Sequence, residues 1–140
     1  KKILIVSANY YEEITNKLVN SSINTLKKKN TIISVLKVSG VFEIPIAIKK
    51  QINKYDAFIA IGCVIKGKTP HFDFICSSCF DAILKLSISY NKPIGNGIIT
   101  AFNMKQANER CGLIKSSKPN KGTEAARAVL SIINNAPKKI

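Results

Sequence analysis

The chain has 140 residues, enough for one domain that buries about two-thirds of the surface its unfolded form would expose. Its formal charge is +14, yet 20 of its 22 basic residues are lysines scattered among 23 Ile and 13 Asn. This joint enrichment indicates coding bias in an AT-rich genome rather than a clustered basic face, which disfavours a general nucleic-acid-binding protein. No apolar run approaches a membrane span and no secretory signal opens the sequence, so we expect a cytoplasmic protein with no membrane partner.

Apolar segments alternate between strand-like and helix-like patterns along the whole chain. The predicted strands are residues 2–6, 31–38, 55–63 and 93–100, and the predicted helices are residues 12–29, 42–53, 72–90, 104–111 and 122–134. Strands that alternate with helices pair in parallel through right-handed crossovers. The sequence therefore predicts an α/β fold in one domain (residues 1–140), a three-layer α/β/α flavodoxin-like arrangement with a four-stranded parallel sheet. Because the first residue is Lys1 rather than Met, we expect a few residues to precede it.

The most informative stretch, Gly62 to Asp73, reads GCVIKGKTPHFD and follows the third predicted strand. It predicts a polar turn with two glycines that leads into a helix. Such turns lie at the carboxyl ends of parallel strands, where α/β proteins bind ligands. The free N–H groups at the helix start favour an anion, and Lys66 and Lys68 add positive charge. The strand exits at Asn9–Tyr10, Gly40–Glu43 and Thr100 are expected at the same edge.

His71 is the only histidine of the chain and lies in this turn. A lone histidine is often structural, but an imidazole beside an anion site suggests proton transfer on a phosphorylated substrate. A helix N-terminus disfavours the charged ring, which would leave it neutral and able to accept a proton. Thr69 would either bind phosphate oxygens or cap the helix.

Several further positions have a chemical or a structural interpretation. Arg110 is one of two arginines, and its planar fork suits phosphate, whereas Arg127 is expected on the surface. Lys121 is either a second anion contact or solvated, and Tyr10 either stacks on a planar ring or packs. The C-x-x-C pair of Cys76 and Cys79 favours core packing over a redox or metal role. No cluster of metal ligands, P-loop or Gly-x-Gly-x-x-Gly motif occurs, so no metal is expected.

Five motifs in one order resemble the 6,7-dimethyl-8-ribityllumazine synthase family over nearly the whole chain. They are SGVFEIP (39–45), GCVIKGKTPHFD (62–73), NGIIT (96–100), QANER (106–110) and NKGTEAA (120–126). The resemblance implies a cofactor-free condensation of 5-amino-6-(ribitylamino)uracil with 3,4-dihydroxy-2-butanone 4-phosphate.

The resemblance also implies roles for single residues. Tyr10 would stack on the pyrimidine ring. The ribityl chain would be lined by Val41, Phe42 and Glu43. The edge of the uracil would contact Cys63, Val64 and Ile65. Lys68 and Thr69 would hold the phosphate through backbone N–H groups, helped by Arg110, and His71 would shuttle protons. In this family, Asn96, Arg110 and Lys121 face the site of the adjacent subunit, so a pentamer, or two pentamers as a decamer, is expected.

The sequence departs from the family pattern at four of these positions. Tyr10 replaces Phe or Trp but keeps an aromatic face, and Lys68 replaces an acidic residue. Asn96 stands where Phe is common, and Ser39 replaces a usual Pro. None of these changes removes a group that the chemistry needs. Two rival functions are a flavin- or lumazine-binding protein of the same fold without turnover, and a basic nucleic-acid-binding protein, whose RNA binding would depend steeply on salt.

Overall fold

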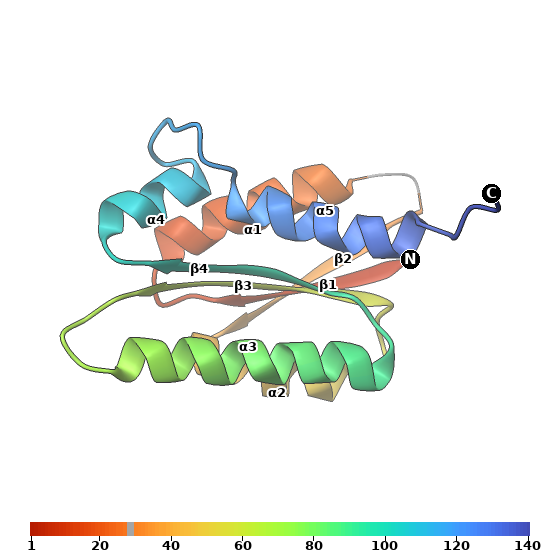
Figure 1. Cartoon of the computed structure of the whole chain (residues 1–140), viewed down its shortest axis with the longest axis horizontal. Coiled ribbons are helices and arrows are strands. Elements are labelled where there is room, and N and C mark those ends of the chain that lie inside the picture. The colour runs from red at the N-terminus through yellow and green to blue at the C-terminus, as the bar shows by residue number, and fades with distance from the viewer. Residues whose placement is uncertain (28–29) are drawn as a thin grey trace.

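The computed structural model describes residues 1–27 and 30–140, which form three layers around one sheet (Figure 1). The strands are β1 (Lys2–Ala8), β2 (Ile32–Val38), β3 (Ala57–Ile65) and β4 (Ile94–Ala101). They pair in parallel in the order β2-β1-β3-β4. The predicted α/β fold with a four-stranded parallel sheet is therefore confirmed.

Helices cover both faces of this sheet. Helices α1 (Glu12–Leu26), α4 (Met104–Cys111) and α5 (Lys121–Asn134) lie on one face, and α2 (Ile44–Gln51) and α3 (His71–Tyr90) lie on the other (Figure 1). A 3-10 turn, η1 (Val41–Glu43), leads directly into α2. The central strands β1 and β3 are apolar at nearly every position because side chains alternate between two covered faces.

The layer of α1 and α5 is held by close backbone contact as well as apolar packing. A side chain at residue 122 would overlap the backbone carbonyl of Leu18, so only glycine fits there. The buried hydroxyl of Ser22 donates a hydrogen bond to the Gly122 carbonyl at 2.9 Å. These contacts fix the start of α5 against the middle of α1.

Several of the predicted boundaries were wrong; the helix predicted over residues 42–53, for example, is η1 followed by α2, which ends at Gln51. Helix α1 ends at Leu26, where its buried stripe ends, instead of continuing to residue 29; residues 28 and 29 lie outside the described residues. The third strand, predicted over 55–63, runs from Ala57 to Ile65, so the turn that was placed from Gly62 begins only at Lys66; residues 62–65 pair with residues 98–101 of β4. Gly62 serves packing rather than turning, since an added Cβ would lie 2.6 Å from Val41 Cγ2.

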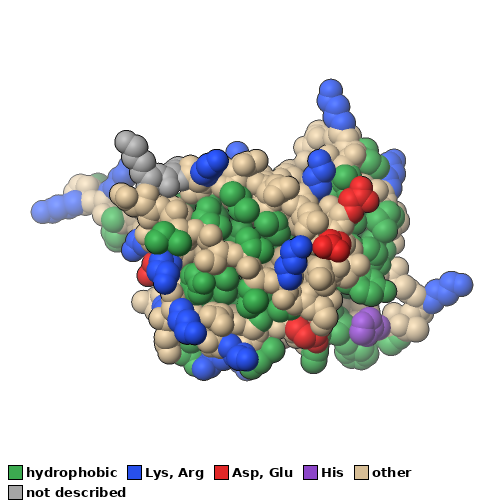
Figure 2. Space-filling view, turned by 180° about the vertical axis from the view of Figure 1, so that it is seen from behind, with side chains coloured by type: hydrophobic (Ala, Val, Ile, Leu, Met, Phe, Trp, Pro, Cys, Tyr) green, Lys and Arg blue, Asp and Glu red, His purple; other side chains and the backbone are tan. Residues whose placement is uncertain are grey.

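The outer face of α3 exposes large apolar side chains among polar and charged ones. Only Cys79 and Ile83 of this helix are buried, whereas Phe74, Leu84 and Ile88 are exposed. Seen from behind, the molecule also carries apolar side chains in the middle of a face with lysines around them (Figure 2). In the part of the chain that the structure describes, no helix is both long and apolar enough to cross a membrane.

Candidate functional site

A cavity of about 370 Å³ opens where β1, β2 and β3 end, which is the size of a small-molecule site. Its wall comes from each of the three strand exits and from the first turns of α3. The lining residues are Tyr10, Tyr11, Gly40, Val41, Phe42, Glu43, Cys63, Val64, Ile65, His71 and Ile75. The structure thus brings eight of the predicted site residues together: Tyr10, Val41, Phe42, Glu43, Cys63, Val64, Ile65 and His71.

Tyr11, Gly40 and Ile75 line the cavity but were not predicted as site residues. Tyr11 is held edge-on against Tyr10, with ring centroids 4.9 Å apart and planes at 86°. Burial raises the pKa of Tyr11, with a smaller contribution from Tyr10, so its hydroxyl stays protonated. Ile75 follows His71 by four residues on α3, and this spacing was a usable signal because such positions share a helix face.

The aromatic walls of the cavity are open to solvent. Tyr10 is 77% exposed and Phe42 is 63% exposed, although both are apolar over most of their surface. Aromatic rings left in water beside a cavity provide stacking area for a planar ligand. Glu43 adds a carboxylate, and His71, the first residue of α3, adds an exposed imidazole.

The inner wall is fixed by the contact between η1 and β3. Val41 is buried against Gly62, and the Cys79 thiol donates to the Val41 carbonyl at 3.5 Å. Cys63 is buried beside them in β3. Burial raises the pKa of Cys63 to about 12, and the proximity of Cys111 adds to this effect. The thiol in the cavity wall is therefore neutral at ordinary pH.

Lys68 and Thr69 lie in the exposed connection between β3 and α3 and do not line the cavity. The residue before α3 is Pro70, and no side chain caps the helix, so Thr69 does not have the capping role that its position allowed. The first N–H groups of α3 remain available for other partners. Lys66 is engaged elsewhere, because its ammonium lies over the Phe102 ring at 5.3 Å.

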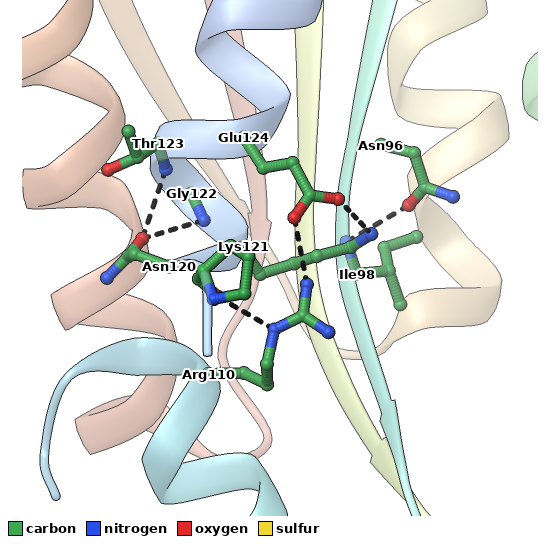
Figure 3. A network of polar contacts seen from close by, with 9 residues as sticks. Asn96, Ile98, Arg110, Asn120, Lys121, Gly122, Thr123 and Glu124 are labelled. Carbon is green, nitrogen blue, oxygen red and sulfur yellow. Dashed lines mark hydrogen bonds and ion pairs between the residues drawn. The ribbon is translucent and has the colours of Figure 1, made fainter. Parts of the chain in front are cut away.

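Arg110, Lys121 and Asn96 form a second group, separate from the cavity (Figure 3). Arg110 donates from Nε to the Pro119 carbonyl at 2.8 Å, and its Nη2 pairs with Glu124 Oε2 at 3.0 Å. Lys121 Nζ contacts the other oxygen of Glu124 at 3.3 Å. Two positive side chains thus share one carboxylate at the start of α5, which leaves net positive charge there.

Two asparagines complete this second group. Asn120 caps α5 by accepting hydrogen bonds from the Gly122 and Thr123 N–H groups at 2.9 and 3.0 Å (Figure 3). Asn96 lies on the edge strand β4, and its Oδ1 accepts from the Ile98 N–H at 3.0 Å. A smaller cavity of about 190 Å³ adjoins Arg110 and also contacts Thr100 and Lys118. Within one chain, these residues do not join the cavity that holds His71.

Only one cysteine of the C-x-x-C pair belongs to the protein core. Cys79 is buried and Cys76 is partly exposed, and both thiols are free. Burial raises the pKa of Cys79 to about 12. Among residues 1–27 and 30–140, no three histidine, cysteine or acidic side chains are grouped so that they could hold a metal ion.

The parallel sheet, the cavity at its carboxyl edge and the basic side chains of Arg110 and Lys121 define an α/β protein with a candidate small-molecule site. A model of the family described as 6,7-dimethyl-8-ribityllumazine synthase matches residues 1–136. The protein of that name from Bartonella bacilliformis is 38% identical over 94% of this chain and 87% of its own length. That from Corynebacterium glutamicum strain R is 33% identical, over 92% of this chain and 80% of its own. The chain belongs to the 6,7-dimethyl-8-ribityllumazine synthase family, as the sequence motifs indicated.

Proposed function

We infer that this chain is an enzyme that makes 6,7-dimethyl-8-ribityllumazine, the penultimate compound of riboflavin biosynthesis. Its substrates are 5-amino-6-(ribitylamino)uracil and 3,4-dihydroxy-2-butanone 4-phosphate. The observation that supports this most directly is the cavity between Tyr10, Glu43 and His71, which combines an aromatic wall, a carboxylate and an imidazole. Membership of the family identifies the reaction that we assign to this cavity.

In the proposed mechanism, Tyr10 stacks on the pyrimidine ring and Cys63, Val64 and Ile65 contact its edge. Val41 and Phe42 line the ribityl chain, whose hydroxyl groups donate hydrogen bonds to Glu43. His71 moves protons while an amine of the uracil attacks the ketone and water leaves to give an imine. Phosphate is then eliminated, and the second amine attacks the remaining carbonyl and releases a second water as the ring closes. Backbone N–H groups at Lys68 and Thr69 bind the phosphate. No cofactor takes part in this scheme, so activity should survive treatment with a chelator.

The separate position of Arg110, Lys121 and Asn96 supports a site completed by a neighbouring copy. One chain cannot place these residues in its own His71 cavity without rearrangement, whereas a ring of copies can present them to the next cavity. The exposed side chains of Phe74, Leu84 and Ile88 on α3 offer such a ring apolar area to bury. We propose a pentamer, or two pentamers face to face, with shared active sites.

The connection between α4 and α5 argues against larger shells. Residues 112–120 form a loop that is hydrogen-bonded to α4. The Ser116 hydroxyl donates to Glu109 at 3.1 Å, and the Pro119 carbonyl accepts from Arg110. This loop is about three residues longer than the short glycine-containing link that resemblance to shell-forming members implies, and it contains Pro119. A projecting, positively charged loop should keep pentamers apart.

Two experiments test these proposals. Purified protein mixed with both substrates should form a product that absorbs near the visible range, and a chain that binds lumazine without forming it would support the non-catalytic alternative instead. Native mass spectrometry should give five or ten copies. A particle of about sixty copies would contradict the loop argument, and a stable active monomer would contradict the shared site.

We place the enzyme in the cytoplasm, where its four free thiols would stay reduced.

A further inference from the structure

The carboxylate of Glu43 folds back onto residues 39 and 40, the start of the turn that contains it. Its Oε1 accepts a hydrogen bond from the Ser39 hydroxyl at 3.1 Å. The backbone N–H of Glu43 donates to the Gly40 carbonyl, also at 3.1 Å, and closes the same five-residue segment. Both the main chain and the side chain of Glu43 are therefore tied to residues 39 and 40, at the edge of the cavity.

Gly40 provides the space for this arrangement. Its φ of −151° is extended backbone that any residue adopts, so glycine is not needed for conformation. A Cβ at residue 40 would instead lie 2.9 Å from Glu43 Oε1. The carboxylate thus packs on the bare Cα of Gly40 while the hydroxyl of Ser39 holds it in place.

A glutamate side chain that is partly exposed normally samples several rotamers, and binding a substrate hydroxyl requires one of them. A hydrogen bond in the free protein removes part of that ordering cost before the substrate arrives.

We propose that Ser39 is a positioning residue that orients the Glu43 carboxylate toward the ribityl hydroxyl groups of the substrate. Oε1 is held by Ser39, and Oε2 remains free to accept from the substrate. The inference rests on the proposed function, since the ligand is the ribityl chain of the uracil. Ser39 itself takes no part in bond making or breaking.

The test compares Ser39→Ala with Ser39→Thr, which keeps the hydroxyl. In Ser39→Ala, the KM and the dissociation constant for the ribityl-uracil should rise about three- to tenfold, as expected for one hydrogen bond. The kcat and the KM for the butanone phosphate should stay the same, and Ser39→Thr should restore binding. Ser131→Ala is the matched control, because it also removes an exposed hydroxyl and its 2.7 Å hydrogen bond, but on α5.

A second arm separates positioning from a general structural effect. In a Glu43→Ala background, adding Ser39→Ala should change uracil binding by less than twofold, because the acceptor that Ser39 holds is gone. Uracil binding that is unchanged or tighter in Ser39→Ala would overturn the proposal, as would an equal loss in the Glu43→Ala background. If the unmodified protein binds the ribityl-uracil but forms no product, the proposed enzymatic function fails while the binding arms still decide the role of Ser39.

Discussion

The guanidinium of Arg110 meets the carboxylate of Glu124 at 3.0 Å, although the two residues stand fourteen positions apart at opposite ends of a loop. Lys121 contacts the second oxygen of the same carboxylate. Because Glu124 neutralises only one of the two cations, net positive charge remains beside it. In the proposed shared site, this charge would meet the phosphate bound by a neighbouring copy.

Arg110→Ala should weaken binding of the phosphorylated substrate about tenfold or more, because it removes a charge-assisted contact. The measurement is the KM for the butanone phosphate, together with competition by inorganic phosphate. Phosphate should compete with this substrate and not with the uracil. Arg127→Ala is the matched control, since it removes the only other arginine, which is exposed on α5. Competition against the uracil alone would show that the phosphate site is misplaced.

His71→Ala should lower kcat by about a hundredfold or less, at the low end of what positioned acid–base groups contribute, because imine formation and phosphate loss proceed slowly unaided. Binding of the ribityl-uracil, measured by titration without the second substrate, should survive. A kcat equal to that of the unmodified protein would remove the proton-transfer role from His71.

Gly62→Ala should lower the free energy of unfolding by about 1–3 kcal/mol, because the added methyl group overlaps Val41 in a packed wall. Chemical denaturation gives this number. Gly67→Ala is the control: a methyl group there meets no atom within 4 Å, so stability should stay the same or rise slightly. Combining Gly62→Ala with Val41→Ala should recover part of the loss, and strict additivity of the two changes would argue against the contact.

Stability should fall as the pH rises above about 8.5, where cysteines of the unfolded chain begin to lose their protons. In the folded state, burial raises the pKa of Cys63 and of Cys79 to about 12, so both thiols stay neutral. The contribution of these two thiols to the free energy of unfolding is complete below the pKa that they have in the unfolded chain. It is lost as the pH approaches 12, because between these two pKa values the thiols release their protons only in the unfolded state. Urea unfolding at pH 8 and pH 10 measures the change. In Cys63→Ala the decrease between these pH values should be smaller, and an equal decrease would contradict the buried neutral thiol.

The order of strands and helices followed from the sequence because each element has its own apolar period. The boundary at Gly62–Ile65 did not, because two glycines and nearby lysines suggest a turn locally. What makes these residues a strand is pairing with β4, more than thirty positions later. The meeting of Tyr10, Glu43 and His71 was predictable from topology, since parallel strands end at one edge. The separation of Arg110 and Lys121 from that cavity was implied by the family resemblance, whereas no local pattern specifies the path of residues 111–120.

The bare outer face of α3 has a consequence for handling this protein. Phe74, Leu84 and Ile88 expose their side chains to water in the single chain, and exposed apolar area promotes association without specificity. If the proposed pentamer buries them, a substitution that weakens only the contact between copies would appear first as turbidity or poor recovery, with the fold of each chain still intact. Low yield of a variant should be traced to assembly before it is attributed to misfolding.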